Sequence, residues 1–139
     1  MTTPPINELF AVAETLRSAM IEVAAGCPET GNCFSVAASG VVAIPTPEGF
    51  TLELIHGNPT GSGRIEGIEF AHAWIELSDE SGMMVIDFSN GRDAIAPAPL
   101  YYRHGKITET VRYGREEAIR EMVKSGHYGP WDEYTNSLA

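Results

Sequence analysis

Basic residues, cysteines and long apolar runs are all scarce in this sequence. The 139 residues include 9 Lys and Arg against 19 Asp and Glu, a formal net charge of −10. Nucleic acids and anionic membranes are bound mainly through Lys and Arg, so we expect no nucleic-acid partner and no membrane partner. No apolar run approaches the roughly 20 residues that span a bilayer. Residues 1–5 lack the basic and apolar regions of a signal peptide.

Cysteine occurs only at Cys27 and Cys33. Two cysteines are too few for a disulfide framework. Without an export signal we expect a reducing, cytoplasmic compartment in which both thiols are free. Cys33, His72 and Asp87 are all of metal-ligand type. Closely spaced ligand pairs such as Cys-x-x-Cys are missing, however, so we expect no metal and no other cofactor.

The length and composition fit a single domain over residues 1–139, because shares of 43% hydrophobic and 20% charged residues are ordinary for a globular protein. Apolar residues at three- and four-residue spacing predict a first helix over residues 6–25, ended by a Gly and a Pro. A second, short helix is predicted to begin near Cys33 and to stop at Gly40.

The later part of the chain changes to the alternating pattern of strands. Strands are predicted at 41–44, 50–56, 68–77, 83–88 and 107–113, with a hairpin connection at 78–83, a loop at 57–66, an irregular segment at 89–100, a helix at 115–124 and an ordered aromatic plug at 128–131. Helices followed by antiparallel strands indicate the α+β class. We expect one layer of N-terminal helices packed on an antiparallel sheet of about four to five strands.

The first segment with chemical interest surrounds Cys33, at the predicted junction between a loop and a helix. The N-terminus of a helix favours negative charge, so this position stabilises a thiolate, the reactive form of cysteine. Backbone N–H groups at the same helix end can point toward a reacting carbonyl, as an oxyanion hole requires. The alternative is that Cys33 is a small, buried apolar residue without reactivity.

The second segment is the predicted strand that carries His72, Trp74 and Glu76. These side chains share one face because successive residues of a strand alternate. The neighbouring Trp74 suits His72 as a shielded general base. The alternative is a core histidine whose hydrogen bonds are satisfied internally.

The third segment places Asp87 after three apolar residues of the predicted strand 83–88. Burying an unpaired carboxylate costs several kcal/mol, so Asp87 needs a partner. His72 on the adjacent strand can donate its ring N–H, which would hold the imidazole in one tautomer. The alternative is that Asp87 caps the turn at residues 89–91.

Together, these segments resemble the core of the transglutaminase-like branch of the papain-like superfamily. In that branch a Cys at a helix start is followed by a strand His, often as His-x-Trp-x-Glu, and then by a strand Asp. The resemblance covers about residues 30–90. It implies a papain/transglutaminase-like core in which Cys33 is the nucleophile, His72 the base and Asp87 the orienting residue. Short segments such as Gly-Asn-Cys and Gly-Pro-Trp are also similar to small uncharacterised proteins of bacteria and their phages, which implies a bacterial or phage-infected cell.

The oxyanion site departs from that pattern. Papain uses a Gln there, and this sequence contains none. We expect the second donor to be Asn32, the Cys33 amide, or a side chain of Trp74 or His56. His56 precedes the predicted loop at 57–66, where it can line the cleft. The predicted helix after Cys33 is also shorter than is usual in the family.

The remaining histidines and late aromatic residues carry weaker expectations. His104 and His127 lie in polar segments and are expected at the surface or in contacts with the tail. Tyr101, Tyr102, Tyr128 and Trp131 are expected either in core and rim packing or along a substrate groove.

The sequence therefore predicts cysteine-dependent acyl transfer or amide hydrolysis by a peptidase, isopeptidase, amidase or transglutaminase-like enzyme. The expected substrate is a peptide, a protein or a small amide, and its identity depends on loops. The alternative is a non-catalytic binding or host-modulating protein that keeps the fold. No pattern indicates an oligomeric state.

Overall fold

Five antiparallel strands form one sheet in the structure, a computed structural model that describes residues 5–29, 31–61 and 66–138. The strands are β1 (Thr51–Gly57), β2 (His72–Asp79), β3 (Gly82–Asp87), β4 (Ala94–Pro97) and β5 (Thr110–Tyr113), in the order β4-β3-β2-β1-β5. The helices are α1 (Pro5–Thr15), α2 (Arg17–Ala25), α3 (Cys33–Ala43), α4 (Ala98–Gly105), α5 (Arg115–Ser125) and α6 (Glu133–Leu138), and a 3₁₀ turn, Ser89–Gly91, follows β3. The α+β class and the antiparallel sheet are confirmed.

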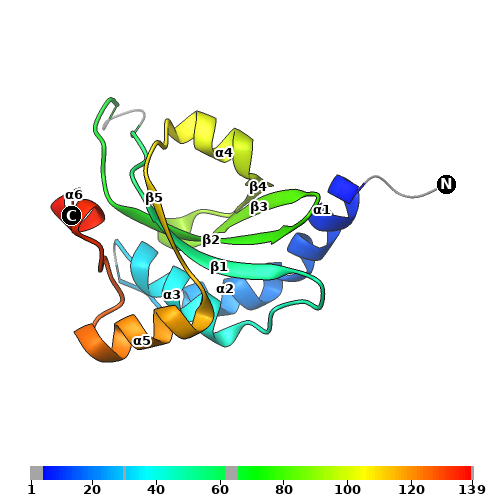
Figure 1. Cartoon of the computed structure of the whole chain (residues 1–139), viewed down its shortest axis with the longest axis horizontal. Helices are drawn as coiled ribbons and strands as arrows, with labels where there is room; N and C mark the ends of the chain where they lie inside the picture. Colours follow the sequence, from blue (N-terminus) through cyan, green and yellow to red (C-terminus); the bar gives the residue numbers. More distant parts are fainter. Residues whose placement is uncertain (1–4, 30, 62–65, 139) are drawn as a thin grey trace.

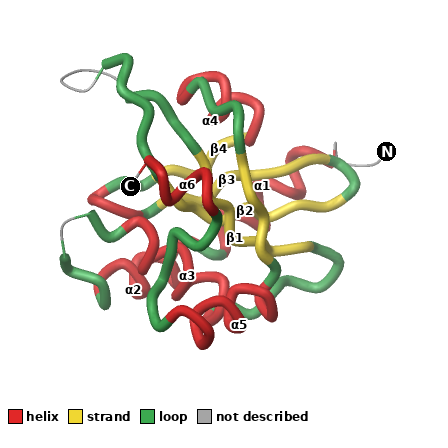
Figure 2. Tube along the Cα trace, turned by 60° about the vertical axis from the view of Figure 1, so that its left-hand side comes forward, coloured by secondary structure: helices red, strands yellow, loops and turns green. Residues whose placement is uncertain are grey.

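Helices cover both faces of this sheet (Figures 1 and 2). The helices α1, α2, α3 and α5 lie on one face. Helix α4 lies on the other face, where Tyr101 and Tyr102 pack against Ile55 of β1 and Trp74 of β2. The prediction of a single helix layer is therefore wrong.

The predicted irregular segment at 89–100 is also wrong, because it contains β4 and the start of α4. Its prolines occupy positions that regular structure tolerates. Pro97 is the last residue of the edge strand β4, and Pro99 lies in the first turn of α4, where its missing N–H would have no helical partner.

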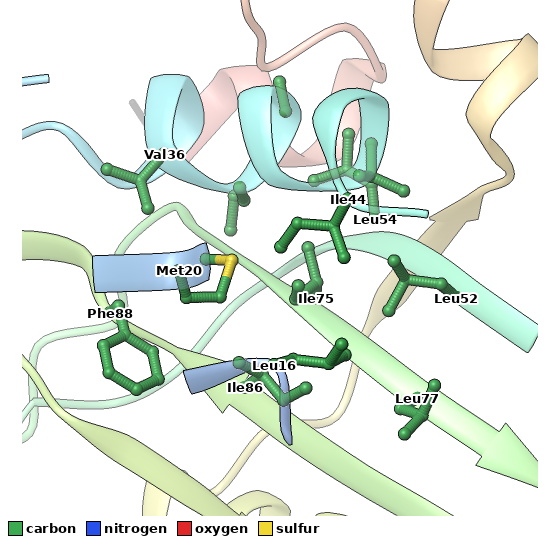
Figure 3. Packing of buried hydrophobic residues seen from close by; sticks show 14 of the residues in the cluster. Leu16, Met20, Val36, Ile44, Leu52, Leu54, Ile75, Leu77, Ile86 and Phe88 are labelled. Carbon is green, nitrogen blue, oxygen red and sulfur yellow. The ribbon is translucent and has the colours of Figure 1, made fainter. Parts of the chain in front are cut away.

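The main core lies between the sheet and the helices α1, α2, α3 and α5 (Figure 3). Helix α3 continues past Gly40, so the predicted strand at 41–44 is wrong. A short apolar run does not distinguish a strand from a buried helix. Here the helical form directs Val41 into the core, and Ile44, the extended residue after the helix, is buried there as well. A Cβ at Gly40 would lie 3.0 Å from the sulfur of Met20. The glycine therefore permits close packing of α2 on α3.

The predicted first helix, residues 6–25, is interrupted at Leu16. The Thr15 hydroxyl donates to the carbonyl of Val12, and the Leu16 N–H bonds to the carbonyl of Ala13. Local bonds of this kind bend a helix, so the chain turns between α1 and α2. None of the helices in the described ranges has the length and apolarity needed to cross a membrane.

The predicted loop at 57–66 lies between β1 and β2. Its residues 62–65 are outside the described residues, as are residues 1–4 at the start of the chain. Thr60 and Glu69 form an isolated antiparallel bridge on either side of that gap. Strand β2 begins at His72, later than predicted, and this start places His72 at the end of the sheet.

Candidate active site

Cys33, His72 and Asp87 each lie at the end of an element. Cys33 is the first residue of α3, His72 the first of β2, and Asp87 the last of β3. All three are buried, with exposed fractions of 6%, 2% and 2%. In the β2–β3 ladder Ile75 pairs with Ile86. The next position of this register sets Asp87 opposite Trp74. His72 lies two residues before Trp74 on the same face of β2, so it is the diagonal neighbour of Asp87.

The structure brings His72 and Asp87 into direct contact. The Nε2 atom of His72 lies 2.8 Å from Oδ2 of Asp87. The hydroxyl of Tyr101 also donates to Oδ2, at 2.8 Å, and the N–H and hydroxyl of Ser89 donate to Oδ1. Burial raises the pKa of Asp87, but the hydrogen bonds from His72, Tyr101 and Ser89 outweigh it and hold this pKa below its usual value. Asp87 is therefore a buried carboxylate with satisfied oxygens.

Cys33 lies close enough to the His72 side chain to act on its pKa. Burial lowers the pKa of His72. The hydrogen bonds and charges of Asp87 and Cys33 outweigh burial and raise this pKa to about 9. Since Nε2 faces Asp87, Nδ1 is the ring nitrogen that remains for Cys33. At neutral pH this arrangement favours an imidazolium between two groups that can be negative.

The loop before Cys33 is tied to the turn after Asp87. The side-chain oxygen of Asn90 accepts from the N–H of Gly31 at 2.8 Å, and that of Asn32 accepts from the N–H of Asn90 at 2.8 Å. Asn90 has a φ of 51°, in the left-handed region that Asn tolerates well. These bonds hold the start of α3 against the end of β3. The Asn-Gly pair in the sequence signals the turn, but it does not reveal this partner.

The predicted oxyanion donors differ in whether their N–H groups are already used in other hydrogen bonds. Asn32 directs its amide nitrogen to the carbonyl of Cys27 at 2.6 Å, which uses one of its two N–H groups. The single N–H of Trp74 donates to Oε2 of Glu76 at 2.9 Å, so Trp74 has no donor left for Cys33. The first bond of α3 runs from the N–H of Val36. The backbone N–H of Cys33 precedes it and is an orphan donor of the helix start.

His56 lies apart from the cavity that borders His72. Its ring contacts those of Phe34, Tyr113 and Trp131 at centroid distances of 4.9, 5.0 and 5.1 Å. It is fully buried, and burial lowers its pKa to about 4 despite Asp132, whose Oδ1 lies 3.5 Å from Nδ1. His56 thus belongs to the aromatic packing under the predicted plug at 128–131.

A cavity of about 290 Å³ opens on the α4 side of the sheet. Its walls include His72, Tyr101 and His104, together with Phe70 and Arg92. Cys33 does not line this cavity. One side of the His72 ring therefore faces the cavity, and another side faces the thiol of Cys33.

Glu76, the last member of the His-x-Trp-x-Glu segment, is a buried structural carboxylate. It accepts from Trp74 and from the hydroxyl of Tyr102, and Nη2 of Arg112 lies 2.8 Å from its Oε1. These contacts connect β2 with α4 and β5. Sequence reasoning named Tyr101 and Tyr102 as packing or groove residues but missed that they bond to Asp87 and Glu76, and it missed Arg112. The sequence feature that could have indicated such partners is the predicted burial of strand carboxylates, because a buried carboxylate needs hydrogen-bond donors.

The described residues contain no group of three or more His, Cys, Asp and Glu side chains arranged to hold a metal ion. Comparisons of this chain with protein-family models, with curated proteins and with solved structures find no match. The chemistry of the site is therefore argued from its geometry.

Proposed function

We propose that this chain is a small cysteine-dependent enzyme, of papain-like and transglutaminase-like type, that transfers acyl groups or hydrolyses amides. Cys33 is the nucleophile, His72 the general base and acid, and Asp87 the residue that orients His72. One observation carries the proposal: a buried His–Asp pair at 2.8 Å beside a cysteine at a helix start. Peptidase, isopeptidase, amidase and transglutaminase-like reactions share this chemistry, with a peptide, protein or small amide as substrate.

The reaction begins when the Cys33 thiolate adds to the carbonyl carbon and forms a C–S bond. The C–N bond then breaks while His72 gives its proton to the departing amine, which leaves a thioester on Cys33. Water or a second amine next attacks the thioester and passes a proton to His72. The C–S bond breaks, and the thiolate and imidazolium are restored.

The electrostatics of the site support this sequence of steps. His72 needs to be protonated when the amine leaves, and its pKa of about 9 keeps it protonated at neutral pH. The backbone N–H of Cys33, which precedes the first helical hydrogen bond of α3, can donate to the oxyanion. Cys27 and Cys33 form no disulfide, and we place the reaction in a reducing, cytoplasmic compartment.

A non-catalytic binding or host-modulating protein is the second candidate. The observation that favours it is the burial of Cys33, which is 6% exposed and outside the cavity beside His72. An enzyme of this design needs a movement that opens a path to the sulfur. A binding protein needs none.

Alkylation with iodoacetamide between pH 5 and 9, followed by mapping of the modified cysteine, tests the nucleophile. Cys27 is the more exposed of the two thiols, so exposure alone predicts faster labelling of Cys27. The proposal predicts the reverse below pH 7, because a cysteine beside an imidazolium reacts faster than an isolated thiol. His72→Ala should abolish the preference, and His72→Gln serves if the Ala variant is unfolded. His127→Ala, an exposed histidine elsewhere, should not.

Turnover separates the enzyme from the binding protein. p-Nitrophenyl acetate should acetylate Cys33 and release p-nitrophenol repeatedly, and Cys33→Ser should lose this release. Slow, equal labelling of both cysteines would reject the catalytic role. Selective labelling of Cys33 without acetylation or turnover would favour the binding protein.

A further inference from the structure

We propose that the cavity beside His72 binds a carboxylate or similar anionic group on the departing half of the substrate, and that Arg92 is the residue that recognises it. This inference rests on the proposed acyl-transfer function. It adds a substrate class, namely amides whose amine half carries a negative charge.

The charge of the cavity wall is opposite to that of the chain. The cavity is lined by Arg92, His72 and His104, and its described lining includes no Asp or Glu. The chain as a whole carries a formal charge of −10. A basic wall in such an acidic protein is a local feature, and basic groups that converge on a pocket favour an anionic ligand.

Arg92 retains hydrogen-bonding capacity toward that cavity. Its Nε atom lies 3.8 Å from Oδ2 of Asp87, and its side chain is 40% exposed. The adjacent carboxylate, Asp93, pairs with Arg17 instead. Within the described parts of the chain, Asp87 is the single carboxylate that lies within ion-pair distance of Arg92. A guanidinium that faces one carboxylate through Nε can still offer its Nη groups to a second one.

Asp87 and Tyr101 do not remove the site's preference. Asp87 does not line the cavity, and its charge is already matched by the His72 imidazolium. Tyr101 lines the cavity, but its hydroxyl donates to Asp87, so it presents a ring to the ligand. His104 adds an exposed imidazole on the same wall.

The position of His72 decides which half of the substrate enters. His72 gives its proton to the departing amine, so the amine half has to lie beside its ring. The cavity borders His72 and not Cys33, so we assign it to the departing half rather than to the acyl half that Cys33 holds. A volume of about 290 Å³ is near the lower end for ligand pockets. It suits a group the size of one amino acid.

Two acetyl esters test the inference, because one departing group carries a charge and the other does not, and their intrinsic difference in reactivity is the same for every protein variant. The first is 4-acetoxybenzoate, which releases a phenol with a carboxylate, and the second is its neutral methyl ester. The rate of Cys33 acetylation by each is followed by mass spectrometry at pH 7. We compare the ratio of the rate with 4-acetoxybenzoate to the rate with its methyl ester. A change in thiol reactivity, including one caused through Asp87, affects both rates equally and cancels in this ratio.

Arg92→Gln should lower this ratio by about three- to tenfold, the effect of one partly screened charge at short range. Arg92→Lys should give an intermediate ratio, because it keeps the charge and loses the planar fork. The matched control is Arg103→Gln, an exposed arginine of α4 outside the cavity lining, which should leave the ratio unchanged. An equal ratio in wild type and Arg92→Gln overturns the inference and leaves the proposed function standing.

A binding measurement covers the case in which neither ester acetylates Cys33. The side-chain Nε resonance of Arg92 is followed in Cys33→Ser by NMR during titration with 4-hydroxybenzoate and with its methyl ester. A shift with the carboxylate alone supports the anion site even though the proposed function has failed. Without a shift, the anion site is refuted as well.

Discussion

Replacing Asp87 by Asn removes the charge that keeps His72 protonated and preserves the shape of the side chain. Asp87 Oδ2 lies 2.8 Å from Nε2 of His72. Burial alone lowers the pKa of His72, and the hydrogen bonds and charges of Asp87 and Cys33 raise it to about 9. In Asp87→Asn, burial still lowers the pKa of His72, and the largest contribution that raises this pKa is lost. We expect the pKa of His72 to fall below 7.

The effect on stability follows from the two pKa values of His72. The folded value is about 9 and the unfolded value is about 6.5. This interval corresponds to about 3 kcal/mol at 1.36 kcal/mol per pH unit. Because the folded pKa is the higher one, this stabilisation is complete below pH 6.5 and is lost as the pH rises through 9. The difference in unfolding free energy between wild type and Asp87→Asn should therefore shrink by about 3 kcal/mol over that window.

Urea unfolding at several pH values between 6 and 9.5 measures this difference, and NMR of the His72 ring measures its pKa directly. The control is Asp79→Asn, a half-buried carboxylate at the end of β2, whose cost should not vary across the window. The Cys33 alkylation rate at pH 6 should also fall in Asp87→Asn. The reasoning is refuted if His72 of the variant still titrates near 9, or if the stability difference is the same at pH 6 and 9.5.

Three further substitutions test other parts of the structure. Tyr101→Phe removes a hydroxyl that donates to Asp87 and should cost about 1.5–3 kcal/mol in urea unfolding at pH 7, the range for hydrogen bonds to charged groups; an unchanged midpoint would show that solvent replaces the donor. The pKa of His56 is lowered to about 4, so the unfolded chain binds a proton between pH 6.5 and 4 that the folded chain does not. This uptake costs the wild type up to about 3 kcal/mol as the pH falls. His56→Leu should therefore lose less stability than wild type between pH 7 and 4 in thermal unfolding, and parallel losses would contradict this assignment. Gly57→Ala places a Cβ 2.6 Å from a ring carbon of Trp74, and this overpacking should cost about 1–3 kcal/mol; a neutral result in calorimetry would show that the indole can shift.

The hairpin between β2 and β3 explains why the pairing of His72 with Asp87 could be predicted from the sequence. A short connection between two alternating segments predicts neighbouring antiparallel strands. Alternation then places His72 and Asp87 on one face, and the cost of burying a lone carboxylate requires a partner for Asp87. Each step depends on residues close in the chain. The structure shows the His72–Asp87 contact that this reasoning predicts.

Helix α3 and the segment before α4 show where such reasoning failed. Residues 41–44 read equally well as a strand or as a buried helix, and packing of α3 between α2 and the sheet decided for the helix. Pro97 and Pro99 suggested irregular structure, but the edge of the sheet and the first turn of α4 accommodate them. Both outcomes depend on neighbours that are distant in sequence.

The sequence by itself determined the residue types at the site, the antiparallel hairpin that carries two of them and the helix start that carries the third. Only the tertiary structure decided which partner each buried polar group has. It assigned Tyr101 to Asp87, the N–H of Trp74 to Glu76, and His56 to an aromatic cluster away from the cavity. The physical reason is that local periodicity determines which face a side chain occupies, whereas a buried donor or acceptor bonds to whichever group the folded chain brings within about 3 Å.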